Sequence, residues 1–172
     1  MAETSKAFHQ GKPFRETLHG WWLGLEQDRG GRAFLRRCRK PLEVFGCESF
    51  HQDLLAPLRR KGIDPNAWEL DRLAALAGLF AHVKTEAKEG LAKVMARPKR
   101  GGTQPTVSPL RFRRLLAVED LDELYLALVR MLRLVEGLAD PADLSRIVFE
   151  WGDKTRRNLS LNYFALVTAG KQ

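Results

Sequence analysis

The sequence is poor in the residues that build disulfide frameworks and metal centres. Its 172 residues include two cysteines and four histidines. Cys38 and Cys47 are too few for a disulfide framework, and zinc sites usually combine short paired spacings of cysteine and histidine. We therefore expect both cysteines to be core or free thiols in a reducing compartment, and we expect no bound metal and no cofactor.

Long apolar stretches are also absent. No apolar run approaches the roughly 18 residues that a membrane-spanning helix needs, so no membrane contact is expected. The first residues, Met1–Lys6, lack the apolar stretch of a secretion signal. Together these absences predict a cytoplasmic protein.

The motifs that mark common enzyme sites are missing as well. The histidines do not share the H-E-x-x-H spacing, no glycine loop carries the lysine of a phosphate site, and no Gly-x-Ser-x-Gly elbow occurs. Asp120, Asp122 and Glu123 form an acidic cluster, but the helix dipole explains acidic side chains in a first helical turn. The sequence therefore predicts a protein without enzymatic activity.

Positive charge is what the chain has in excess, with 29 Lys and Arg against 21 Asp and Glu and a formal net charge of +8. The segment Arg29–Lys40 holds six basic residues and no acidic one. In a helix, Arg32, Arg36 and Lys40 would share one face at i, i+4 and i+8. The inward face would carry Phe34, Leu35 and Cys38. Such a helix suits a polyanion better than a small substrate.

Four further basic clusters follow along the chain. They lie at Arg59–Lys61, Arg97–Arg100, Arg111–Arg114 and Lys154–Arg157. A single charge run is usually a solvated surface, but five clusters in a chain of this net charge favour phosphate contacts. Nucleic acid is therefore the expected partner.

Helical periodicity runs through the chain, and the alternating pattern of strands is missing. We predict an all-α protein made of two small helical bundles, residues 14–97 and 108–169, joined by a basic loop. That loop, at 97–107, has three basic residues, two glycines and two prolines, so we expect it to be mobile. We expect residues 1–13 to be polar and frayed.

Local signals place the helix ends. Gly30 and Gly31 are expected to end a first helix over 14–27. The following helices are expected over 29–40 and 48–61, from Asp64-Pro65, from Ser108-Pro109 and from Asp140-Pro141. Among the tryptophans, Trp21, Trp68 and Trp151 fall in apolar stripes and are expected in the core. Trp22 lies beside its stripe and is the better candidate for an exposed contact.

Three blocks of sequence, taken in order, form a recognisable pattern across about residues 21–167. The first is Trp22-x-x-Leu25 followed by Asp28-Arg-Gly-Gly-Arg32-Ala33-x-Leu35-Arg36-Arg37. The second is Val107-Ser108-x-x-Arg111-Phe112-x-x-Leu115-Leu116, preceded by Gly90–Ala96. The third is Asp143-Leu144-x-x-Ile147-x-x-x-Trp151, leading to Asn162-Tyr163-Phe164. The chain thereby resembles the CasB family, the small subunit of the type I-E CRISPR Cascade surveillance complex.

The resemblance implies a non-catalytic, all-helical subunit that acts in antiviral defence. Its implied partners are other Cascade subunits, guide RNA, target DNA and a second copy of itself. Family members pair as a dimer and hold the guide RNA–target DNA hybrid and the displaced strand, which stabilises the R-loop. In guide-directed recognition, base pairing reads the sequence, so such a subunit needs only contacts to the nucleic-acid backbone.

The resemblance matches family basic positions at Arg36, Arg37, Arg111, Arg114, Lys154, Arg156 and Arg157. The helical row adds Arg32 and Lys40, whereas Lys99 and Arg100 rest on charge alone. Asp153 puts an acid where a more basic stretch is expected. These eleven cations form the predicted nucleic-acid-binding set.

The sequence leaves two other functions open. A free-standing helical DNA-binding regulator would need a recognition helix with base-reading side chains, and the polar residues of 111–117 are nearly all arginine. A small nuclease would need a metal-ligand cluster, which the sequence does not offer.

Overall fold

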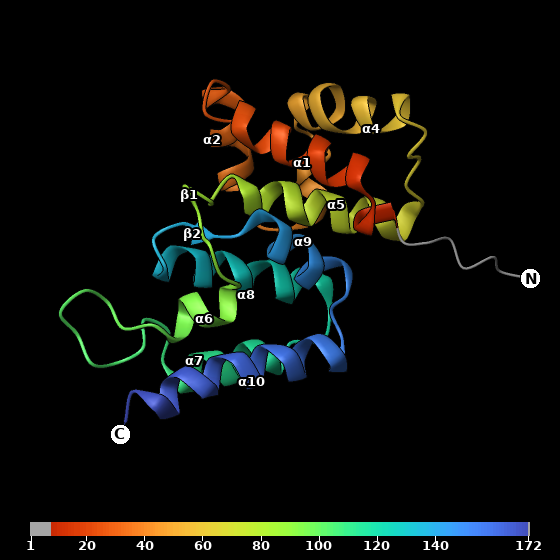
Figure 1. Ribbon diagram of the computed structural model, residues 1–172. Coiled ribbons are helices and arrows are strands. Elements are labelled where there is room, and N and C mark those ends of the chain that lie inside the picture. The colour runs from red at the N-terminus through yellow and green to blue at the C-terminus, as the bar shows by residue number, and fades with distance from the viewer. Residues whose placement is uncertain (1–7, 172) are drawn as a thin grey trace, which may run out of the picture. The chain divides into compact units, whose positions relative to one another are not determined.

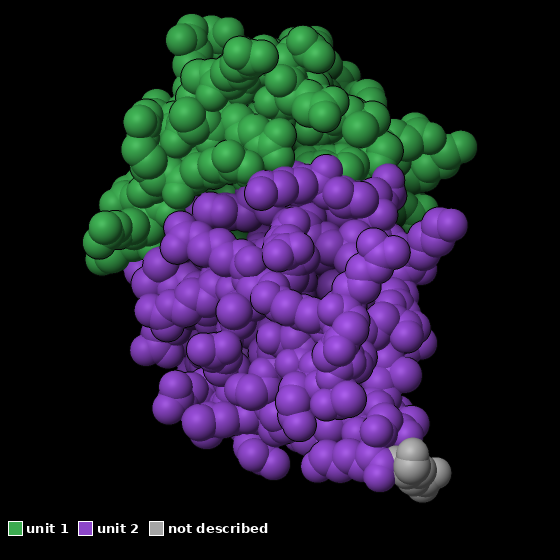
Figure 2. Space-filling view, turned by 90° about the vertical axis from the view of Figure 1, so that its left-hand side faces the viewer, with its two compact units in different colours: residues 1–81 green, residues 82–172 purple. Residues whose placement is uncertain are grey.

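The computed structural model describes residues 8–171 and divides the chain into two compact units, one ending at Ala81 and one beginning at His82 (Figures 1 and 2). Helices make up most of both units, and the strands of the described residues are two residues long. The predicted all-α class is confirmed. Residues 1–13 were expected to be frayed; residues 1–7 lie outside the described residues, whereas residues 8–10 form a 3-10 helix and the next helix begins at Lys12, so for residues 8–13 the expectation was wrong.

The N-terminal unit is a set of short helices assembled around one long buried helix. Its elements are η1 (Phe8–Gln10), α1 (Lys12–Gly24), α2 (Arg29–Arg37), α3 (Pro41–Val44), the π-helical η2 (Phe50–Leu55), α4 (Ala56–Arg60) and α5 (Ala67–Phe80). Helices α2 and α3 both pack against α5. Every residue of α5 from Leu73 to Phe80 is buried, so this helix is the core of the unit.

Several predicted helix ends in this unit were wrong. Gly30 and Gly31 do not end the first helix, which stops at Gly24; they lie in the first turn of α2. The helix expected over 48–61 is divided into a π-helical and an α-helical part. Gly62 ends it with φ +80°, the left-handed conformation that glycine adopts without strain.

Helix α5 begins two residues after the predicted Asp64-Pro65 start. Asn66 is the N-cap, accepts from the Glu69 N–H and donates its own N–H to the Glu69 carboxylate, a complete capping box. This start leaves Trp68 51% exposed, so its predicted core position was wrong. The Arg72 guanidinium lies 3.6 Å from the centre of the Trp68 ring and covers it instead.

The C-terminal unit is built from five helices and one short parallel strand pair. Its elements are β1 (Thr85–Glu86), α6 (Leu91–Ala96), α7 (Pro109–Leu116), α8 (Leu121–Leu134), β2 (Leu138–Ala139), α9 (Pro141–Phe149) and α10 (Asp153–Ala169). Strands β1 and β2 pair in register Thr85 with Leu138 and Glu86 with Ala139. This pairing was not anticipated, because two residues are too few to show an alternating pattern.

Residues 82–96 belong to the C-terminal unit, although the sequence assigned them to the first bundle. Strand β1 pairs with β2, and α6 packs along α10. Figure 1 shows α6 in green and α10 in dark blue. The Asp143 carboxylate of α9 also accepts from the Leu91 N–H at 2.7 Å and so caps α6. The compact units therefore divide at Ala81–His82. The two helical bundles predicted over 14–97 and 108–169 stay a prediction.

Candidate nucleic-acid interface

Arg32 and Arg36, the first two members of the predicted basic row, form hydrogen bonds with the end of α5. Their Nε atoms donate to the Ala81 carbonyl at 3.2 and 2.9 Å. Carbonyls at a helix C-terminus lack partners within the helix and carry partial negative charge, so two guanidiniums stabilise them. Burial, followed by repulsion from Arg36, lowers the pKa of Arg32. These arginines hold α2 against α5.

Arg37 and Lys40 have exposed side chains but do not share one helix. Helix α2 ends at Arg37, and Cys38 is extended, with φ −62° and ψ 129°. Lys40 is the N-cap position of α3. The predicted helix over 29–40 was therefore too long. Of its inward residues, Leu35 and Cys38 are buried, whereas Phe34 is exposed.

The start of α2 depends on a close approach at Gly31. The Asp28 carboxylate accepts from the Gly31 N–H at 2.9 Å, and a Cβ on Gly31 would lie 2.0 Å from Asp28 Oδ2 and 2.8 Å from Ser49 Oγ. A side chain here would displace the cap of the helix that carries the basic row. Gly30 has nothing within 4 Å of an added Cβ.

We predict opposite effects of alanine at these adjacent glycines. Gly31→Ala breaks the Asp28 cap and should lower the free energy of unfolding by about 1–2 kcal/mol. Gly30→Ala relieves only the backbone entropy of glycine in a helix and should raise it by up to about 1 kcal/mol. Urea denaturation measures both, and equal destabilisation by the two would contradict the capping role.

The loop that carries Lys99 and Arg100 is closed at its base. Pro98 and Pro105 form an antiparallel bridge, and the Thr106 N–H and hydroxyl both donate to the Arg97 carbonyl at 2.9 and 2.8 Å. Lys99 and Arg100 are exposed. The loop therefore lies within the C-terminal unit, is closed at its base by hydrogen bonds, and holds two cations in solvent. Its expected mobility stays a prediction.

Of the three basic residues on α10, Arg156 is bound within the unit. It donates to the Val118 carbonyl at 2.5 Å, and the Trp151 indole N–H donates to the same carbonyl at 2.9 Å. The Arg156 guanidinium also lies 5.3 Å from the Trp151 ring centre. Lys154 and Arg157 are exposed. Trp151 and Arg156 therefore share one carbonyl, and both contribute to the packing of the C-terminal unit.

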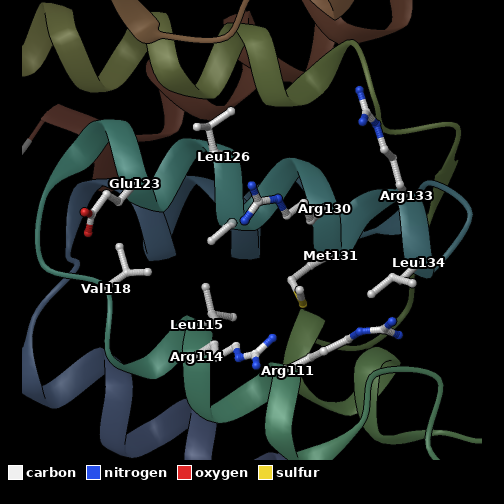
Figure 3. Close-up of a pocket in the computed structure, with 11 residues that line it drawn as sticks. Arg111, Arg114, Leu115, Val118, Glu123, Leu126, Arg130, Met131, Arg133 and Leu134 are labelled. Atoms are coloured by element: carbon white, nitrogen blue, oxygen red, sulfur yellow. The ribbon is translucent and has the colours of Figure 1, made fainter.

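Arg111 and Arg114 line a groove between α7 and α8 with a volume of about 700 Å³ (Figure 3). Two arginines of α8, Arg130 and Arg133, line the same groove. Arg130 and Arg133 were not predicted from the sequence, although their i, i+3 spacing places both on one face of a helix. The structure therefore brings four arginines together where two were predicted.

Eight of the eleven predicted cations have exposed side chains that form neither an ion pair with a carboxylate nor a hydrogen bond among residues 8–171. They are Arg37, Lys40, Lys99, Arg100, Arg111, Arg114, Lys154 and Arg157. Exposed cations without a neighbouring carboxylate are available to bind phosphate. Arg32, Arg36 and Arg156 are instead occupied, at least in part, by backbone carbonyls.

Other chemistry has little support in the described part of the chain. No three side chains of His, Cys, Asp or Glu are placed to hold a metal ion there. Cys38 and Cys47 are buried free thiols, as expected. Burial, followed by the nearby Glu43 and Cys47, raises the pKa of Cys38 to about 11, which keeps this thiol protonated at neutral pH. None of the helices in residues 8–171 is long and apolar enough to cross a bilayer.

Comparison with known proteins identifies the family. The model of the CRISPR-associated protein Cse2 family matches residues 31–164, and the chain belongs to that family. Cse2 is the CasB family that the three sequence blocks resemble, so this prediction is confirmed. No curated protein matches the chain.

The fold is also similar to that of a chain in a crystal structure of E. coli Cascade bound to a PAM-containing dsDNA target (32-nt spacer) at 3.20 Å resolution. The two chains superpose with a TM-score of 0.65 at 18% sequence identity, and the match covers 90% of this chain and 96% of the other. The likeness therefore extends over both compact units.

Proposed function

We propose that this protein is a non-catalytic small subunit of a type I-E CRISPR Cascade complex and stabilises the R-loop in antiviral defence. The membership of the Cse2 family is the observation that carries the proposal. The likeness to a chain of a DNA-bound Cascade supports it. The subunit would work in the cytoplasm beside other Cascade subunits, and two copies would pair within the complex.

The proposed contacts are made with the nucleic-acid backbone. The exposed cations lie on α7, on α10, on the loop at 97–107, at the end of α2 and at the start of α3. Arginine and lysine at such positions neutralise phosphates without selecting a sequence. Sequence choice would remain with the guide RNA.

Co-assembly is the direct test. The protein is expressed together with guide RNA and the other Cascade subunits, and the complex is purified with and without it. We expect the protein to co-purify and the complete complex to release matched target DNA about tenfold more slowly than the complex without it. The preference for matched over mismatched targets should be unchanged.

Two results would count against this function. A footprint of the isolated protein at one defined operator would favour a free-standing regulator, whose dimers bind half-sites at fixed spacing. Metal-dependent cleavage of nucleic acid that is lost on changing one carboxylate would favour a nuclease. Failure to co-purify with any Cascade subunit would remove the proposal.

A further inference from the structure

The groove between α7 and α8 combines an apolar floor with a basic rim. Leu115 and Met131 are buried at its base, and Leu126 and Leu134 lie along its α8 side (Figure 3). Leu126 is 37% exposed. Phosphate groups alone have no apolar surface that could cover this floor.

The rim carries a strong excess of positive charge. Arg111 and Arg114 stand on the α7 side and Arg130 and Arg133 on the α8 side, and Glu123 is the one acidic residue among the lining residues. None of the four guanidiniums forms an ion pair with a carboxylate of residues 8–171. Four arginines gathered around apolar surface complement an occupant that is both acidic and apolar.

The chemistry of the floor separates two such occupants. Single-stranded nucleic acid gains affinity by stacking its bases on aromatic rings, and the groove is lined by leucine, methionine, valine and alanine with no aromatic residue. The nearest aromatic of α7, Phe112, is buried and stacks on Tyr163. An aliphatic groove suits aliphatic side chains instead, as in complexes where an amphipathic helix lies in an apolar groove.

We propose that this groove docks an acidic amphipathic helix of a partner protein. Leucine-like side chains of that helix cover the floor, and its Asp and Glu side chains pair with the four arginines. Under this proposal Arg111 and Arg114 bind carboxylates of the partner protein, and the other six exposed cations of the predicted set remain for phosphate. The groove residues of α8 run from Glu123 to Leu134, which spans about 16 Å, or about 12 residues of a docked helix.

The test uses the isolated full-length chain and a fluorescent synthetic peptide of about 12 residues, the length of the groove. The ordered peptide has leucines at i, i+4, i+7 and i+11 and glutamates elsewhere. The scattered peptide has the same composition with its leucines placed around the helix. We expect fluorescence anisotropy to show the ordered peptide binding at least about tenfold more tightly than the scattered one.

Substitutions of the floor distinguish a peptide from nucleic acid. Leu126→Lys and Leu134→Lys each remove apolar surface from the floor, and this loss should weaken binding of the ordered peptide about tenfold despite the added positive charge. Binding of oligodeoxythymidylate should stay equal or become tighter. Leu161→Lys is the matched control, because Leu161 is 65% exposed on α10 outside the groove, and it should leave peptide affinity unchanged.

Arg130→Glu combined with Arg133→Glu should abolish peptide binding. Circular dichroism checks that each variant keeps its helical content. Equal affinity for both peptides, or equal weakening by Leu161→Lys and Leu126→Lys, would overturn the proposal. If oligodeoxythymidylate displaces the peptide, and the variant that combines Arg130→Glu with Arg133→Glu binds neither probe, the groove binds nucleic acid and the proposal is overturned. These measurements need no guide RNA, so their failure is distinct from a failure to co-assemble with Cascade.

Discussion

Phe112→Ala is expected to lower the free energy of unfolding by about 3–5 kcal/mol, the usual cost of emptying a buried phenylalanine site. Phe112 is fully buried. Its ring stacks on Tyr163 with 3.9 Å between centroids and 11° between planes, and it meets the edge of Phe164 at 5.7 Å. These rings attach α7 to α10, so the loss should also loosen the helix that carries Arg111 and Arg114.

Two companion variants separate the causes. The Tyr163 hydroxyl donates to the Val107 carbonyl at 2.5 Å, and Tyr163→Phe should cost about 1 kcal/mol by removing that hydrogen bond alone. Leu110→Ala changes a residue on α7 that is 57% exposed and should stay within about 0.5 kcal/mol of the unchanged protein. Urea denaturation measures all three. A loss below about 1 kcal/mol for Phe112→Ala would mean that α7 is held by other contacts.

The helix starts that the sequence predicted correctly are those set by local chemistry. Ser108, Asp120 and Asp140 each accept a backbone N–H of the following turn, and Pro109 and Pro141 follow two of them. These contacts span two or three residues, so the sequence alone contains them. The acidic cluster at Asp120 accordingly caps α8, as the helix-dipole argument required.

The roles that the sequence could not predict depend on residues far apart in the chain. Arg36 bonds to a carbonyl 45 residues away, and Arg156 to one 38 residues away. No spacing rule connects such positions, so their charge and the family resemblance placed both among the predicted phosphate contacts. The buried positions were easier: Leu35 and Trp21 lie in the core as their apolar spacing predicted, whereas Trp151, also predicted in the core, is half-buried.

Trp68 and the α7–α8 groove show a second limit of the sequence. Trp68 fits the apolar stripe of its helix, yet the buried part of α5 begins at Leu73 and the tryptophan is left under Arg72. Arg130 and Arg133 form a site only because α7 faces α8 across a groove. Helical periodicity tells which face is apolar, but it does not tell where along that face the packing partner begins or ends.

The largest functional effect is expected from four exposed cations of the C-terminal unit that line no part of the α7–α8 groove. Replacing Lys99, Arg100, Lys154 and Arg157 by glutamine should weaken DNA binding by the isolated protein about 100-fold at low salt. This figure takes about 0.7 kcal/mol for each exposed contact to phosphate, or about 2.8 kcal/mol for four. For duplex DNA the slope of log K against log salt should also become shallower by about 3.6, since each contact contributes about 0.9.

A control with the same change in net charge tests whether position matters. Lys12, Arg59, Arg97 and Arg146 each already pair with a carboxylate, namely Glu16, Asp64, Glu89 and Asp143. Replacing these four by glutamine removes the same charge from cations that a neighbouring acid occupies, so we expect less than about a tenfold loss and a slope change below about 1. If the two sets weaken binding equally, the affinity follows the net charge of the whole protein, and a localised phosphate-binding surface is ruled out.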